Sequence, residues 1–96
     1  MAKKKKREFY RKNFANLSIN IPWKHFKDIL IKDFGFGMET KSGSVRVFIK
    51  EDARFTVHEP HGKGDPIVSY LDRKKAIRAL FALGFLDKKE GGEDFE

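Results

Sequence analysis

The stretch Gly43–His61, GSVRVFIKEDARFTVHEPH, decides the fold that we expect for this chain. Apolar residues alternate with others over 45–49 and again over 54–58, and a polar turn at 50–53 separates the two runs. A period of two is typical of half-buried strands, and two such runs joined by a short polar turn predict an antiparallel hairpin. A short strand over 38–41, followed by a turn at 42–44, would complete a three-stranded sheet.

Amphipathic segments on both sides of the hairpin predict two helices. The first covers 23–34, where Trp23 and three further apolar residues recur at spacings of three and four, and Gly35 ends it. The second begins after Ser69 or Asp72, either of which can cap it, and ends at Gly84. The expected fold is therefore α+β in the order α-β-β-β-α, with two helices packed on one face of a three-stranded antiparallel sheet. The other face of the sheet would stay open.

The 96 residues fit one small domain, with charge divided unevenly along the chain. We expect a basic N-terminal extension with a short helix over 1–15, a single α+β domain over 16–86 and a mobile acidic tail over 87–96. Residues 1–12 hold seven Lys or Arg against one Glu, which is +6 of the net charge of +7. Residues 13–86 contribute +4 and residues 87–96 contribute −3. Most of the basic excess therefore lies in the extension.

The composition excludes several classes of protein. The chain has no cysteine, so disulfide frameworks, zinc ribbons and thiol nucleophiles are ruled out. No apolar run approaches the roughly 20 residues that a membrane helix needs, and no signal-peptide region follows the lysines. We therefore expect a soluble cytoplasmic protein without a membrane partner.

Basic residues in three places are candidates for contacting an anionic ligand. If Phe55 and Val57 face the core, Arg54 lies on the open face of the sheet, and Arg46 on the neighbouring strand should lie there too, although solvated charge is the default reading of such a face. Lys63 follows in a glycine-containing loop that lacks the spacing of a P-loop. The N-terminal tract is either phosphate-seeking or a solvated terminus, and it consists of Lys3, Lys4, Lys5, Lys6 and Arg7.

His58 and His61 are the candidate catalytic residues. Metal-free RNA cleavage needs a base for the ribose 2′-OH, an acid for the leaving oxygen and cations for the phosphate, and histidine suits both proton roles near neutral pH. The alternative is that Pro60 sets His61 as a loop anchor bonded to the backbone. Glu59 could pair with a histidine, but we expect it to face solvent. A metal site formed by the two histidines with Asp65 is a weak ligand set, so we expect neither a metal nor another cofactor.

Three segments of the chain resemble a known family. They are SGSVRVFI at 42–49, FTVHEPHGK at 55–63 and ALGF at 82–85, and NFANLSINIPWKHFKDILI at 13–31 is similar to a branch with an extra N-terminal segment. The sequence looks like the HicA-type toxins of bacterial toxin–antitoxin pairs. That resemblance implies a double-stranded-RNA-binding-domain-like fold, endoribonuclease activity on mRNA (an mRNA interferase) and a cognate antitoxin protein as partner.

The chain departs from this family at one position. Many members carry a catalytic histidine directly after the Gly-Ser of the strand turn, whereas Gly43-Ser44 is followed here by Val45, which cannot accept a proton. If cleavage survives, His58 or His61 must act as the base. Two other functions stay open: a non-catalytic RNA-binding module of the same fold, and a protein-interaction component that docks an acidic partner through Arg73, Lys74 and Arg78.

Overall fold

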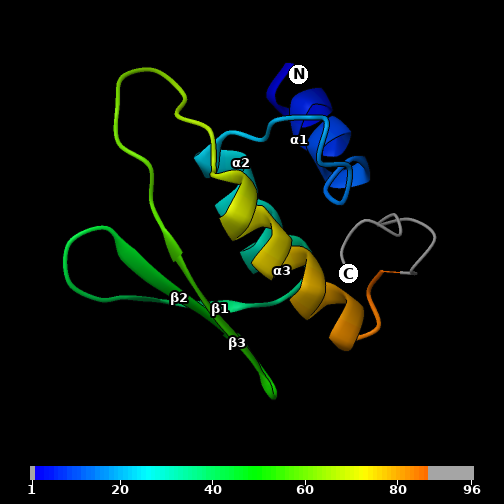
Figure 1. The fold of residues 1–96 in the computed structure, drawn as a ribbon. Coiled ribbons are helices and arrows are strands. Elements are labelled where there is room, and N and C mark those ends of the chain that lie inside the picture. The colour runs from blue at the N-terminus through cyan, green and yellow to red at the C-terminus, as the bar shows by residue number, and fades with distance from the viewer. Residues whose placement is uncertain (1, 87–96) are drawn as a thin grey trace.

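A computed structural model describes the backbone of residues 2–86 and the side chains of residues 6–86 (Figure 1). Its elements follow the predicted order of helix, three strands and helix, preceded by one further helix. They are α1 (Ala2–Lys12), α2 (Trp23–Asp28), a π-helical segment η1 (Ile29–Asp33), β1 (Gly37–Thr40), β2 (Val45–Lys50), β3 (Ala53–His58) and α3 (Tyr70–Ala82). The predicted acidic tail at 87–96 lies outside the described residues.

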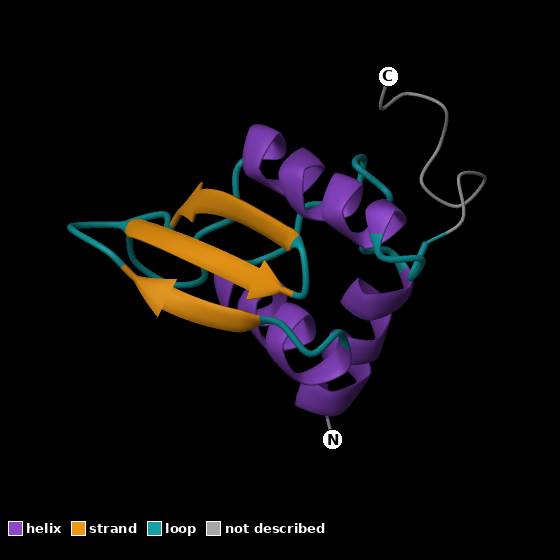
Figure 2. Cartoon of the chain, turned by 90° about the horizontal axis from the view of Figure 1, so that it is seen from below, coloured by secondary structure: helices purple, strands orange, loops and turns teal. Residues whose placement is uncertain are grey.

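The three strands form one antiparallel sheet in the order β1-β2-β3, and the helices cover one of its faces (Figures 1 and 2). In the β2–β3 register Phe48 lies opposite Phe55, and both rings enter the core, stacked with their centroids 5.4 Å apart. Neighbouring residues of a strand point to opposite faces, so Val47 lies on the open side, away from the face of Phe48. Its partner Thr56 lies directly opposite and shares that face. The predicted α+β class and three-stranded antiparallel sheet are confirmed.

The register corrects the expected position of Arg46. Arg46 lies opposite Val57, which is fully buried on the helical side of the sheet, so Arg46 does not share the open face with Arg54. The expectation failed because both phases of β2 are apolar: Val47 and its two neighbours of the same phase occupy one face, and Phe48 occupies the other. Alternation by itself therefore did not tell which phase faces the helices.

The core is built mainly from aromatic rings on the helical side. Phe26 of α2 stacks on Phe14 at 5.5 Å and meets Phe48 of the sheet edge-on at 6.0 Å. The helix predicted over 23–34 is present, although its last turn is wider than an α-helix, since Phe34 N–H donates to Ile29 O at 3.1 Å. None of the helices in the described part of the chain is long and apolar enough to cross a bilayer.

Arg73 is buried, which corrects its expected place on an exposed basic face of α3. Only 2% of the residue is exposed, and its guanidinium donates to Phe14 O at 2.6 Å, to Asn16 O at 3.1 Å and to Ile19 O. Burial lowers the pKa of Arg73 to about 10, so the side chain stays protonated at neutral pH. Arg73 therefore fastens the segment after α1 to the first turn of α3. The N-terminal extension belongs to the same folded core, because Phe14 is 1% exposed.

Candidate functional site

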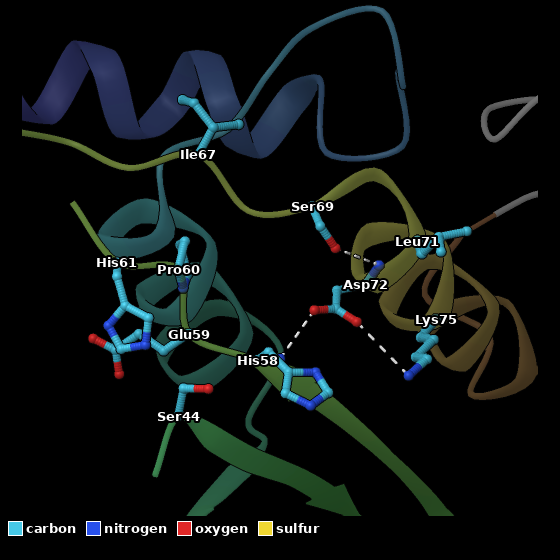
Figure 3. Close-up of a pocket in the computed structure, with 10 residues that line it drawn as sticks. All are labelled: Ser44, His58, Glu59, Pro60, His61, Ile67, Ser69, Leu71, Asp72 and Lys75. Carbon is cyan, nitrogen blue, oxygen red and sulfur yellow. Dashed lines mark hydrogen bonds and ion pairs between the residues drawn. The ribbon is translucent and has the colours of Figure 1, made fainter.

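A pocket of about 540 Å³ lies where β3 ends, beside the loop that follows it and the start of α3 (Figure 3). It contains both candidate catalytic histidines. Its lining consists of Ser44, His58, Glu59, Pro60, His61, Ile67, Ser69, Leu71, Asp72 and Lys75. The loop and the helix thus bring residues from four parts of the chain to one place.

Backbone hydrogen bonds hold the loop of residues 59–68 at both ends. At its start Glu59 N–H donates to Ser44 O at 2.8 Å. At its end Val68 N–H donates to Ile21 O at 3.0 Å, within a short bridge between the segment before α2 and the segment before α3. The loop that carries His61 is therefore fixed to the sheet on one side and to the helical layer on the other.

His58 lies across from the first residue after the turn that precedes β2. It lies directly opposite Val45 in the β2–β3 register, and the Glu59–Ser44 bond flanks this pair. A pair flanked in this way is non-hydrogen-bonded, the type in which opposite side chains approach most closely. The ring of His58 therefore shares its face with the side chain of the residue that follows Gly43-Ser44.

Asp72 ties His58 to α3. The residue is only 6% exposed, and Asp72 Oδ2 accepts a hydrogen bond from His58 N–H at 2.9 Å. Ser69 is the N-cap of α3, because its Oγ accepts from Asp72 N–H at 3.1 Å. Lys75 Nζ donates to Thr56 O at 2.9 Å and lies 3.7 Å from Asp72 Oδ1, which places an ammonium group in the same pocket as the histidines.

The two histidines line one pocket without touching. Both are exposed, and within residues 6–86 no hydrogen bond or ring contact joins them. Figure 3 shows the two rings separated at the pocket. A substrate group would therefore have to lie between them for both to act on it.

Arg46 and Glu59 pair with each other. Arg46 Nε donates to Glu59 Oε1 at 3.0 Å, and Arg46 Nη1 donates to Gly43 O and Val45 O at 2.9 Å each. The Arg46 side chain is only 16% exposed. The Glu59 side chain is 37% exposed, as expected in part, and its partner is Arg46, which the sequence did not predict. Arg46 fixes the turn and the start of the loop, and its donors are largely occupied.

The remaining predicted RNA-binding residues do not line the pocket. Arg54 is exposed on the open face of the sheet, and Lys63 is exposed in the loop. Lys6 and Arg7 lie on α1, which packs on the helical side of the molecule (Figure 1), and Arg7 Nη2 bonds to Asp33 Oδ1 at 2.6 Å. The side chains of Lys3, Lys4 and Lys5 lie outside the described residues.

Sequence reasoning missed two residues of the pocket. Asp72 was considered solely as a helix cap, and Lys75 was not singled out, although the two stand three apart in the first turns of a predicted helix. That spacing put them on one helical face, but nothing in the sequence showed that this face meets the end of β3. Among the described residues, no group of three His, Cys, Asp or Glu side chains could hold a metal ion.

Comparison with known proteins adds no relative. A scan against protein-family models, a search of curated proteins and a search of solved structures each found no match to this chain.

Proposed function

We propose that this protein is a HicA-like toxin of the cytoplasm that binds mRNA and cleaves it by histidine acid–base chemistry, and that a cognate antitoxin neutralises it. The observation that carries the proposal is the direct pairing of Val45 with His58. The family places its catalytic histidine after Gly-Ser, where this chain has Val45. His58 lies opposite that position, on the same face, so an imidazole is present on the strand beside it.

The residues around the pocket supply the groups that metal-free RNA cleavage requires. In the proposed reaction His58 removes the proton from the ribose 2′-OH, and the resulting oxygen attacks the adjacent phosphorus. The bond to the 5′-oxygen of the next nucleotide breaks, and His61 donates the proton that this oxygen takes up. Lys75, whose Nζ lies 2.9 Å from Thr56 O, supplies positive charge for the phosphate at the transition state.

The experiment is cleavage of a single-stranded RNA by the purified full chain, once with EDTA and once with magnesium. The proposal predicts cleavage in both, with 2′,3′-cyclic phosphate ends on the products. An RNA of the same sequence with 2′-O-methyl riboses should bind but stay intact, because it has no 2′-OH to attack. Cleavage that requires magnesium, or that leaves the 2′-O-methyl RNA equally cut, would contradict the chemistry.

A second function is favoured by the separation of the two histidines. Both are exposed and do not contact one another, which also suits a non-catalytic RNA-binding module with the same fold. In that case RNA would bind without turnover, and the affinity would fall steeply with salt as counterions are released. Intact RNA in EDTA and in magnesium, together with salt-dependent binding, would establish this alternative over cleavage.

A further inference from the structure

A second pocket lies on the helical side of the molecule, at the contact of α1 with α2. Its volume is about 260 Å³, just below the roughly 300–1,000 Å³ of pockets that hold drug-sized ligands. It is lined by Arg7, Lys24, His25, Lys27 and Asp28. Arg7, Lys24 and Lys27 are positively charged and Asp28 is negatively charged, so the lining residues carry two more positive charges than negative ones. The pocket is large enough for a small anionic group.

The cations of this pocket are only partly neutralised by the protein. Lys24 pairs with Asp65 at 3.1 Å, but both side chains are more than half exposed, so this ion pair is weak and easily exchanged. Lys27 is half-buried and has no ion pair within residues 6–86. Arg7 pairs with Asp33 at 2.6 Å, so Lys27 is the cation of the lining that no ion pair neutralises in the described part of the chain.

Arg7 has an unused donor. Its Nη2 bonds to Asp33, but its Nε is shielded from solvent and has no hydrogen-bond partner among the described residues. A buried N–H without an acceptor is unfavourable. If the Arg7 guanidinium rotated toward a ligand oxygen, its Nε–H would gain a hydrogen-bond partner. Arginine and lysine together form the donor set that suits a tetrahedral anion, since the first offers a fork and the second a point charge.

We propose that the pocket between α1 and α2 binds a phosphate group, either free phosphate or the terminal phosphate of an RNA strand. A phosphate monoester carries nearly two negative charges near neutral pH, which matches the excess of the lining residues. Asp28, the one carboxylate of the lining, is already subtracted in that excess, and its Oδ2 also lies 3.9 Å from Lys32 Nζ.

His25 provides an internal reporter of binding. Its ring lies 5.0 Å from that of Tyr10 on α1, and its pKa is lowered chiefly by burial and then by Lys24. Lys6 of α1 lowers this pKa further, whereas Asp28 of α2 and Asp65 of the loop raise it. Arg7 of α1 and Lys27 of α2 line the same pocket. A bound phosphate would add negative charge beside the imidazole, so binding should raise the pKa of His25.

The test is an NMR titration of the full chain with inorganic phosphate, following the ring of His25. The matched variants are Lys27→Gln, which removes one charge from the pocket, and Lys41→Gln, which removes one charge from the end of β1. We expect saturable shifts at His25, a raised His25 pKa, and affinity at least about 5-fold weaker in Lys27→Gln but unchanged in Lys41→Gln. No saturable shift, or equal weakening in the two variants, would overturn the proposal.

A second arm separates the two sources of phosphate. Short RNA strands of one sequence, with a 5′-phosphate or a 5′-hydroxyl, are titrated in place of inorganic phosphate. A shift of His25 with the 5′-phosphorylated strand but not with the 5′-hydroxyl strand would assign the pocket to RNA ends. A shift with inorganic phosphate but with neither strand would assign it to free phosphate. Neither outcome depends on cleavage, so the proposal stands or falls separately from the proposed function.

Discussion

Val45 and His58 lie directly opposite each other across β2 and β3, with their side chains on the open face of the sheet. The flanking bond from Glu59 N–H to Ser44 O makes them a close, non-hydrogen-bonded pair. In the family that the sequence resembles, a catalytic histidine stands where this chain has Val45. His58 is therefore the histidine that lies nearest across the strands to the position where this chain lacks one.

The first prediction concerns a histidine restored on β2. The Val45→His variant should cleave RNA at least about 10-fold faster than the wild type, because a positioned base contributes on the order of 10²–10⁴-fold to such reactions. The control is Ile49→His, on the same face at the other end of the strand and opposite Arg54. The rate is measured with EDTA present. An equal gain in both variants would show that the effect does not depend on position.

The second prediction concerns the carboxylate that holds the end of β3. Asp72→Ala should lower the free energy of unfolding by about 2 kcal/mol, because His58 N–H loses its acceptor and the start of α3 loses a carboxylate. Asp72→Asn keeps an acceptor oxygen and should lose about half as much. Urea denaturation measures both variants. Equal losses in the two would mean that the hydrogen bond to His58 contributes little.

The third prediction tests the buried guanidinium that joins α3 to the N-terminal extension. Arg73→Met should destabilise the fold by about 3 kcal/mol, because the carbonyls of Phe14, Asn16 and Ile19 lose their donor in a buried position. Lys74→Met is the control on the same helix, and it should change stability by less than about 0.5 kcal/mol. Similar losses in the two variants would show that the buried contacts of Arg73 contribute no more than a surface side chain.

The fourth prediction is a pH dependence that arises from His25. Burial and then Lys24 lower the pKa of this imidazole below 6.5, so the unfolded chain binds a proton more readily than the folded one. Stability should therefore fall as the pH drops through about 6.5. His25→Gln removes this contribution, and its free energy of unfolding should fall less than that of the wild type between about pH 7.5 and about pH 5.5. An equal fall in both proteins would mean that the His25 pKa is not lowered in the fold.

The hairpin was predictable because it depends on local pattern. Alternation over 45–49 and 54–58 placed β2 and β3 within a residue of their observed ends, and the spacing of apolar residues over 23–34 found the first helix. The face of Arg46 was not predictable, since apolar residues occupy both faces of β2. Deciding between the faces requires knowing where the helices pack.

Contacts between distant segments explain the other differences. The charge of Arg73 suggested exposure, and its burial is tolerable because it donates to carbonyls of residues 54 to 59 positions earlier. Likewise His58 and Asp72 are 14 residues apart and meet only when α3 packs beside β3. The two histidines of the candidate site were predicted from the sequence. Asp72 and Lys75 were not, because only the packing of α3 beside β3 brings them to the pocket.

The most direct measurement of the central claim is single-turnover cleavage of RNA by the His58→Gln variant with EDTA present. Its control is Glu51→Gln, at the other end of the same hairpin. We predict that the wild type and Glu51→Gln cleave at similar rates, whereas His58→Gln is slower by about 10²-fold or more and still binds RNA. Equal rates in all three proteins, or no cleavage by the wild type, would contradict the proposal that His58 acts as the base.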